Sequence, residues 1–287
     1  MTNYIKRCIF IGWTSIAEQC LEAVVKTGII PCSIGVPRGY NTDSIYRSAD
    51  KYKVPVYEIS DSLTVLKEMA VNADLLVCAS FPWKISKDVL QMIRIGAINV
   101  HASALPKYRG LHPLNWAIIN DENKIGVSIH WMEETFDSGK IIAQETFPLE
   151  DSDTIQTVKE KASKLSGILM FYTISEIQKH GASVPAVIQD SRLASPAPAR
   201  TPKDSRIDWR SRSRSIFNLV RASDSSYPAF CLLTDGTKVI VQSIFRSDEY
   251  GKVMKKYDDG SYLIGTRDGV ILVKLGRQDI EEGELLQ

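Results

Sequence analysis

The N-terminal part of the chain alternates short, β-branched apolar runs with segments whose apolar residues recur at helical spacing. This alternation constrains the fold more than any other feature. Strands are expected at residues 5–12, 29–36, 55–59, 73–80 and 96–101, and helices at 14–26, 43–52, 62–71 and 86–93. The run at 73–80 is nearly all apolar, as is typical of a central parallel strand covered on both faces. The pattern predicts an α/β fold with a Rossmann-like, doubly wound and mostly parallel sheet.

The remainder of the chain follows a different pattern. A hairpin is expected from strands at 125–132 and 140–149, followed by a long helix over 153–180. Residues 195–202 contain three prolines and no periodicity, which makes them the best linker candidate. After a short helical pattern at 213–222, strand-like runs at 230–233, 237–245, 251–257, 261–265 and 270–275 are separated by Asp-Gly turn signals at 235–236, 259–260 and 268–269. We expect a first domain over 1–195, a linker over 196–206 and a small antiparallel β-barrel domain over 207–287.

Charge and composition exclude several classes of protein. There are 35 basic and 34 acidic residues, and a net charge of +1 gives no reason to expect a large nucleic-acid footprint. No apolar run approaches the length of a membrane span, and the N-terminus lacks the apolar region of a signal peptide, so no membrane is expected. The five cysteines never form a C-x-x-C pair, which favours reduced thiols in a cytoplasmic protein. With only four histidines besides, a metal site has little support.

In a doubly wound sheet, ligands bind at the carboxyl ends of the strands. The turn after the first strand reads Gly12-Trp13-Thr14 and lacks the G-x-G-x-x-G that a dinucleotide site needs. The Walker, H-E-x-x-H and G-x-S-x-G patterns are also absent. The informative stretch is 99–142, where Asn99 and His101 stand two residues apart at a strand end, with their side chains on the same side.

Asp137 lies in a Gly-containing loop further along, so the three polar side chains can converge at one edge of the sheet. His and Asn can donate to a developing oxyanion, and Asp can hold and charge the His. No Ser or Cys stands where it could act as a covalent nucleophile, so the acceptor itself would attack. Alone, each signal is weak, because a strand-terminal His is more often structural and Asp-Ser-Gly is a common turn. Together they suit acyl transfer.

The stretch NVHASALPKYRG at 99–110 resembles the signature of the 10-formyltetrahydrofolate-dependent formyltransferases, which is close to N-x-H-x-S-L-L-P-x-Y-[RK]-G. Asp137-Ser138-Gly139 resembles the Asp-x-Gly loop of the same family. Ala104 departs from the pattern, where Leu is usual. The segments RTPKD at 200–204, IDW at 207–209, VRA at 220–222 and YPAF at 227–230 are similar to the family's joint and C-terminal part.

The resemblance implies a two-domain enzyme whose small C-terminal domain is OB-like. It implies N10-formyltetrahydrofolate as co-substrate, with no metal, a primary amine as acceptor, and Asn99, His101 and Asp137 as catalytic residues. It places the folate beside the loop after the fourth strand. The residues implied to contact the folate are Phe81, Trp83, Ile85, Leu105, Glu133 and Phe136. The alternative is that the aromatic residues of this set are ordinary core or helix-start residues.

The segment after the signature reads GLHPLNWA at 110–117, and its P-L-N-W-A pattern resembles the sugar-nucleotide N-formyltransferases. This implies that the acceptor is the amine of a nucleotide-linked deoxyamino sugar, used for surface glycans such as lipopolysaccharide. The candidate substrate-binding residues are Lys84, Lys107, Arg109 and Asn115. Because sugar formyltransferases are often dimers, a homodimer is expected.

Two alternatives stay open. Methionyl-tRNA formyltransferase is a relative with the same two-domain organisation, and tRNA would then be the partner, although neither half of the chain is strongly basic. The one dense basic cluster, from Arg200 to Arg221, has seven basic residues against two acidic ones. It could meet a nucleotide diphosphate or form a solvated helix face. The alternative of another class is a catalytically silent folate- or nucleotide-binding module, against which the complete triad argues.

Overall fold

The computed structural model describes residues 4–232, 236–246, 255–256 and 261–275. The chain divides into two compact units and passes between them several times. The first unit comprises Met1–Pro113, Lys124–Pro148 and Lys159–Ala197, and the second comprises Leu114–Asn123, Leu149–Val158 and Pro198–Gln287. The second unit therefore includes two short segments that lie well before the proline-rich stretch at 195–202.

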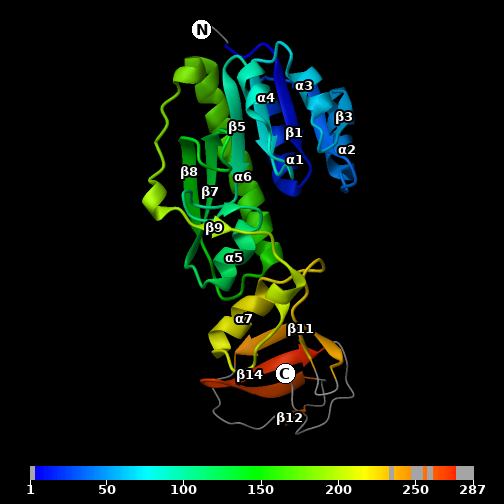
Figure 1. Cartoon of the computed structure of the whole chain (residues 1–287), viewed down its shortest axis with the longest axis vertical. Coiled ribbons are helices and arrows are strands. Elements are labelled where there is room, and N and C mark those ends of the chain that lie inside the picture. The colour runs from blue at the N-terminus through cyan, green and yellow to red at the C-terminus, as the bar shows by residue number, and fades with distance from the viewer. Residues whose placement is uncertain (1–3, 233–235, 247–254, 257–260, 276–287) are drawn as a thin grey trace. The chain divides into compact units, whose positions relative to one another are not determined.

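The first unit is built around one seven-stranded sheet (Figure 1). Its strands are β1 (Cys8–Gly12), β2 (Ser33–Pro37), β3 (Val56–Ile59), β4 (Leu75–Ala79), β5 (Gly96–His101), β7 (Lys124–Trp131) and β8 (Ile141–Pro148). The order across the sheet is β3-β2-β1-β4-β5-β7-β8. The first five strands in this order are parallel, whereas β7 and β8 are antiparallel to their neighbours. This order reverses direction between β1 and β4, which confirms the doubly wound, mostly parallel fold class.

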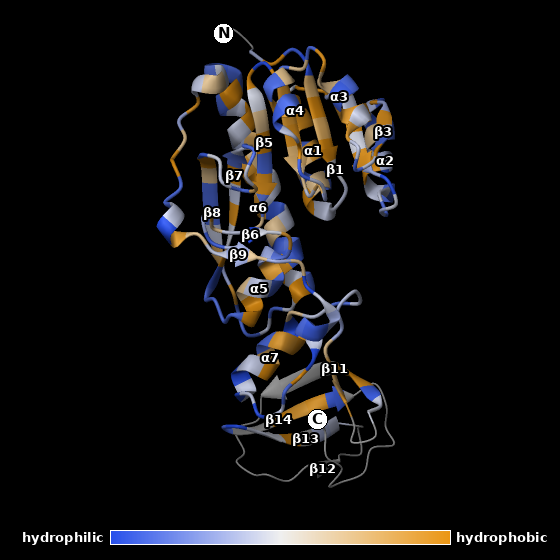
Figure 2. Cartoon of the chain, in the orientation of Figure 1, coloured by the Kyte–Doolittle hydropathy of each residue, from blue (hydrophilic) through white to orange (hydrophobic). Residues whose placement is uncertain are grey.

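Helices α1 (Ser15–Lys26), α2 (Asp43–Tyr52), α3 (Thr64–Ala70) and α4 (Lys87–Met92) connect the parallel strands. Helix α6 (Ile155–His180) follows β8, whereas most of α5 (Pro113–Ile119) and all of α7 (Ser213–Arg221) belong to the second unit. Helices α3 and α4 share one core with β1 and β4, through residues that include Leu66, Val89, Ile9 and Leu76. Every residue of β1 and β4 is buried, and β1 is hydrophobic along most of its length (Figure 2). Among the described residues, no helix combines the length and apolar character that crossing a membrane requires.

The carboxyl ends of β1, β4 and β5 meet at one edge of the sheet. A Cβ on Gly12 would lie 2.2 Å from the carbonyl oxygen of Ala79, so the end of β1 approaches β4 too closely for any other residue. Strand β7 runs beside β5 in a register that places Asn99 opposite His130, and His101 opposite Ser128. This antiparallel addition brings a second strand of polar side chains to the edge where the sequence predicts a site.

The end of the signature segment forms one strand of a short parallel pair, which was not expected from the sequence. Strand β6 (Arg109–Gly110) pairs with β9 (Pro196–Ala197), which are the last residues of the chain before it enters the second unit for good. Two 3-10 turns, at Gly181–Ser183 and Ser191–Leu193, lie between α6 and β9, and a third at Pro202–Ser205 lies in the second unit. The chain thus returns to the signature segment after α6.

The second unit contains an antiparallel sheet in the order β10-β11-β14-β13-β12. Its strands are β10 (Phe230–Leu232), β11 (Lys238–Arg246), β12 (Lys255–Lys256), β13 (Ser261–Thr266) and β14 (Gly269–Leu275). Helix α7 packs on it, and the shared core includes Trp209, Phe217 and Tyr262. The expected small antiparallel β domain is confirmed. Of the expected strand at 251–257, residues 255–256 are described, and the rest, with Asp235, the turn at 259–260 and residues 276–287, lies outside the described residues.

Candidate active site

The loop between β7 and β8, residues 132–140, is held in one conformation from several sides. Asp137 has a φ of 51°, in the left-handed region. A Cβ on Gly139 would lie 1.8 Å from the Trp131 carbonyl oxygen, so only glycine fits where the loop folds back on β7. The Gln189 amide donates to the carbonyl oxygens of Asp137 at 2.8 Å and of Gly139 at 2.7 Å. Its oxygen accepts two bonds from Arg109, at 2.6 and 3.1 Å.

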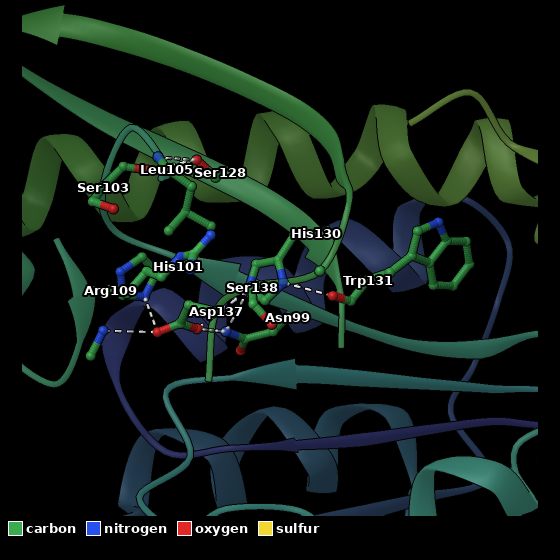
Figure 3. Close-up of polar contacts among 12 residues, drawn as sticks. Asn99, His101, Ser103, Leu105, Arg109, Ser128, His130, Trp131, Asp137 and Ser138 are labelled. Atoms are coloured by element: carbon green, nitrogen blue, oxygen red, sulfur yellow. Dashed lines mark hydrogen bonds and ion pairs between the residues drawn. The ribbon is translucent and has the colours of Figure 1, made fainter. Parts of the chain in front are cut away.

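The loop presents the Asp137 carboxylate to the ends of β5 and β7, and the three predicted catalytic side chains converge there (Figure 3). Oδ2 lies 3.5 Å from Nδ1 of His101 and accepts from the Gly110 N–H at 2.9 Å. Oδ1 lies 3.3 Å from Nδ2 of Asn99 and 3.4 Å from Nε2 of His130. The carboxylate is therefore surrounded by donors and by two imidazole rings.

Burial alone would raise the pKa of the Asp137 carboxyl, because the charged form loses water. The two imidazoles and the Gly110 N–H outweigh burial and lower this pKa to about 2. Asp137 is consequently ionised at neutral pH and can only accept hydrogen bonds.

His101 is buried, and its tautomer follows from its contacts. Nε2 lies 2.7 Å from the carbonyl oxygen of Tyr108, which can only accept, so Nε2 carries the hydrogen. Burial lowers the pKa of His101 below its usual range, and the nearby Asp137 charge offsets only part of this. The neutral ring then turns the lone pair of Nδ1 toward Asp137. A substrate oxygen can use the Nε2 hydrogen only by replacing the Tyr108 carbonyl, whose residue has a φ of 59°.

His130 belongs to the same cluster, although sequence reasoning did not single it out. Its ring is only 2% exposed, and Nδ1 lies 2.8 Å from the carbonyl oxygen of Trp131. Nε2 faces Nδ2 of Asn99 at 3.2 Å. The available signal was a lone histidine inside the apolar strand pattern at 125–132. That histidine indicates a site only once the register of β5 and β7 places His130 opposite Asn99.

The signature segment between Asn99 and Gly110 is fixed by a small network of polar groups. Ser128 Oγ donates to the Ser103 carbonyl at 2.7 Å and accepts from the Leu105 N–H at 3.1 Å. The Gln144 amide donates to Ser128 Oγ and to the Leu105 carbonyl, at 2.8 and 2.9 Å. Leu105, a predicted folate contact, is thus 3% exposed and its backbone groups are bonded within the first unit.

Aromatic rings follow three of the parallel strands at the carboxyl edge of the sheet, and Phe81 and Trp83 also pack against the core beneath. Phe81 and Trp83, which follow β4, pack edge to face with ring centroids 5.4 Å apart. Trp83 meets Tyr40 at 6.3 Å, and Tyr40 meets Trp13 at 4.7 Å. These rings come from the loops after β1, β2 and β4, and Tyr40 is 42% exposed. A partly exposed run of aromatic rings at the point where the strand order reverses fits a flat heterocycle such as the pterin or benzoyl ring of a folate.

The other residues predicted to contact folate or substrate differ in burial and in location. Ile85 is 3% exposed and packs in the core with α3 and α4. Glu133 and Phe136 are exposed on the Asp137 loop, and Lys84 and Lys107 are exposed on other loops. Arg109 is bound to Gln189, as described above. Asn115 is buried in the second unit, where its amide donates to the Ala222 carbonyl at 2.8 Å. No group of three or more His, Cys, Asp or Glu in the described part of the chain is arranged to hold a metal ion.

Several basic residues of the cluster at 200–221 are used inside the second unit. Arg214 donates to the carboxylates of Asp121, at 2.7 Å, and Asp151. Two further arginines, Arg200 and Arg221, are buried and donate to backbone carbonyls. Asp121 and Asp151 belong to the segments 114–123 and 149–158, so these bonds help to explain why both segments join the second unit.

Comparison with known proteins shows which family the chain belongs to. The formyl transferase family model matches residues 53–174, and the model of the formyl transferase C-terminal domain matches residues 200–281. A methionyl-tRNA formyltransferase of Staphylococcus aureus strain MW2 is 32% identical over 261 residues, which cover 90% of this chain and 81% of that protein.

Two solved structures share the fold. WlaRD, a sugar 3N-formyl transferase crystallised with dTDP and 5-N-formyl-THF, is 18% identical with a TM-score of 0.73. An N-formyltransferase from Helicobacter canadensis, in complex with folinic acid and dTDP-3-aminofucose, is 20% identical with a TM-score of 0.70. Each comparison covers 94% of this chain and 98% of the other. The family models and the 32% identical relative show that this chain belongs to the formyl transferase family.

Proposed function

We propose that this formyltransferase moves the formyl group of N10-formyltetrahydrofolate to the primary amine of a nucleotide-linked deoxyamino sugar. The catalytic groups in this proposal are Asn99, His101 and Asp137. The observation that carries the transfer chemistry is the buried, ionised Asp137 in contact with both other residues. Support for a small acceptor comes from the solved structures of similar fold, two of which were determined with dTDP or a dTDP-sugar.

The folate co-substrate supplies a formyl carbon that the neutral amine attacks, and its N10 takes up the proton that the amine loses. Asp137 would accept that proton, directly or through a water, because it is an ionised acceptor in contact with the other two proposed catalytic residues. As negative charge develops on the formyl oxygen, His101 Nε2–H and the Asn99 amide are the donors within reach of the same edge. Phe81 and Trp83 would hold the flat part of the folate.

The contacts made by the basic cluster at 200–221 favour a small acceptor over tRNA. A protein that binds tRNA neutralises many phosphates with exposed Lys and Arg. Here Arg200 and Arg221 are buried and bound to backbone carbonyls, and Arg214 is paired with two aspartates. Arg210 is exposed but paired with Asp208 at 2.9 Å. Much of the basic cluster seen in the sequence therefore serves the second unit itself.

Methionyl-tRNA is the second candidate acceptor, because relatives at 28–32% identity over most of the chain are methionyl-tRNA formyltransferases. The catalytic groups would be the same, and only the acceptor would differ. A homodimer and a cytoplasmic location belong to this proposal under either acceptor. Sedimentation equilibrium tests the first of these.

The decisive experiment incubates the protein with N10-formyltetrahydrofolate and each of a panel of amino-sugar nucleotides, or with charged methionyl-tRNA. Formylation of a sugar nucleotide at a rate well above that of the tRNA supports the proposal. Product on methionyl-tRNA alone replaces it with the second candidate. Folate binding with no product on any acceptor would indicate a binding module instead of an enzyme.

A further inference from the structure

Gln189 is buried, and its side-chain amide bonds two separate segments of the site. The nitrogen donates to the carbonyl oxygens of Asp137 at 2.8 Å and of Gly139 at 2.7 Å. The oxygen accepts from Nε and Nη2 of Arg109, at 3.1 and 2.6 Å. Carbonyls can only accept and a guanidinium can only donate, so one orientation of the amide satisfies all four bonds. In that orientation both hydrogens and both lone pairs of the amide are used.

The backbone that carries Gln189 is fixed on both sides. Two residues before it, Val187 forms an antiparallel bridge with Ile141 at the start of β8, and both N–H···O distances are 2.8 Å. Directly after it, the Asp190 carboxylate caps the following 3-10 turn by accepting from the Arg192 N–H at 3.0 Å. The amide therefore projects from a braced segment, which allows it to hold the loop that it contacts.

The two segments that Gln189 bonds meet at the Asp137 carboxylate. On one side, Asp137 has a φ of 51°, a conformation that non-glycine residues rarely adopt, and Gln189 bonds its carbonyl as well as that of Gly139. On the other side, Arg109 directly precedes Gly110, whose N–H donates to Oδ2 of the carboxylate at 2.9 Å. Without the Gln189 amide, two buried carbonyls would lose a donor, and turning toward another donor would move the loop.

We propose that Gln189 is a positioning residue for Asp137: by bonding the Asp137 loop and Arg109 at once, it holds the carboxylate at the Gly110 N–H. The inference rests on the proposed formyl transfer for its kinetic consequence, but not for its structural one. A reacting group must be held close to its productive geometry by the contacts behind it, and a displacement of about 1 Å can lower the rate about 100-fold.

Two substitutions in the full chain separate the donors of Gln189 from its acceptor. Gln189→Glu keeps the length of the side chain and an oxygen that accepts from Arg109, but a carboxylate has no hydrogen for the two carbonyls. Gln189→Met has a similar length and removes the amide donors and the amide oxygen together. Gln178→Glu is the matched control, because it makes the same change in α6, where the Gln178 amide donates to the Thr27 carbonyl at 3.3 Å. Circular dichroism and thermal melts establish that each variant folds.

We expect Gln189→Glu and Gln189→Met each to lower kcat about 10- to 100-fold, because the two carbonyls lose their donors in both variants. Losses of similar size would show that the bonds to the loop matter as well as the bond to Arg109. Gln178→Glu should match wild type. Wild-type kcat in either Gln189 variant would overturn the proposal.

Amide hydrogen exchange at residues 109–111 tests the structural part without turnover. The Gly110 N–H bonds the Asp137 carboxylate. The N–H groups on either side of it, of Arg109 and Leu111, bond the backbone carbonyls of Ser195 and Ala197 instead. These two neighbours therefore report the pairing of β6 with β9, whereas Gly110 reports the position of the carboxylate.

We expect Gln189→Met to speed exchange at Gly110 toward the rate found in Asp137→Ala, while exchange at Arg109 and Leu111 stays within a few-fold of wild type. Unchanged exchange at Gly110 contradicts the inference. Equal acceleration at all three amides also contradicts it, because Gln189 would then only stabilise the first unit. If the selective change at Gly110 appears and no acceptor is formylated, the proposed function fails alone.

Discussion

Replacing Asp137 by Asn tests the electrostatics of the site without changing its shape. Asn keeps the volume of Asp, and its oxygen can still accept from the Gly110 N–H. The substitution removes a negative charge that accepts from the Gly110 N–H and lies beside the rings of His101 and His130. The pKa of this carboxyl falls from 3.8 to about 2 on folding. At about 1.4 kcal/mol per pKa unit, this corresponds to roughly 2–3 kcal/mol of stability at neutral pH.

The pH dependence follows from the direction of the shift. Because the pKa is lower in the folded state, the contribution is complete above the unfolded value of 3.8 and disappears as the pH falls through about 2. About half of it should remain at pH 3. Asp137→Asn should therefore be less stable than wild type by roughly 2–3 kcal/mol at pH 7, and the gap should narrow in acid.

The assay must report the first unit separately, since a chain with two units need not unfold in one step. Amide hydrogen exchange in peptides from β5 and β7 gives a local free energy of opening for the sheet that carries the site. Wild type and Asp137→Asn are compared at pH 7, 4 and 3, with exchange rates corrected for pH. A difference that is the same at pH 7 and pH 3, or absent at pH 7, would refute the electrostatic reasoning.

Three further outcomes are expected. His101→Ala should fold but lose on the order of 10²–10³ in kcat, measured by single-turnover formyl transfer, because it removes an oxyanion donor; near-wild-type turnover excludes that role. Trp83→Leu should raise the KM for the folate about fivefold, through loss of one ring contact worth about 1 kcal/mol, while Tyr46→Leu, on the exposed face of α2, leaves it unchanged. Gly139→Ala should distort the Asp137 loop, since its Cβ would overlap the Trp131 carbonyl, and abolish transfer while hydrogen exchange in α1 stays near wild type.

Much of the first unit was predictable because its information is local. Each parallel strand is a short apolar run followed by a helix whose apolar residues recur at helical spacing. Periodicity alone therefore identifies these strands and helices. The site residues on β5 followed from the same logic, since a period of two puts Asn99 and His101 on one side of a strand end. The hairpin at 125–149 was also expected, and the structure has it as β7 and β8.

The features that could not be predicted from the sequence depend on strand register and on contacts between residues far apart in the chain. His130 joins the site only because β7 pairs with β5 so that it faces Asn99. Gln189 reaches Arg109 from 80 residues away. The segments 114–123 and 149–158 join the second unit partly through the bonds of Asp121 and Asp151 to Arg214, and no composition shift marks them.

The pairing of β6 with β9 limits where this chain could be shortened. Ser195 accepts from the N–H of Arg109 at 2.9 Å, and the Ala197 carbonyl accepts from Leu111 at 2.8 Å. Between these two lies Gly110, whose N–H holds Asp137. A chain ended just after α6 would keep every strand of the large sheet and the three side chains to which we assign the catalysis. It would nevertheless lose β9 and Gln189, so the smallest autonomous catalytic fragment must extend through Ala197.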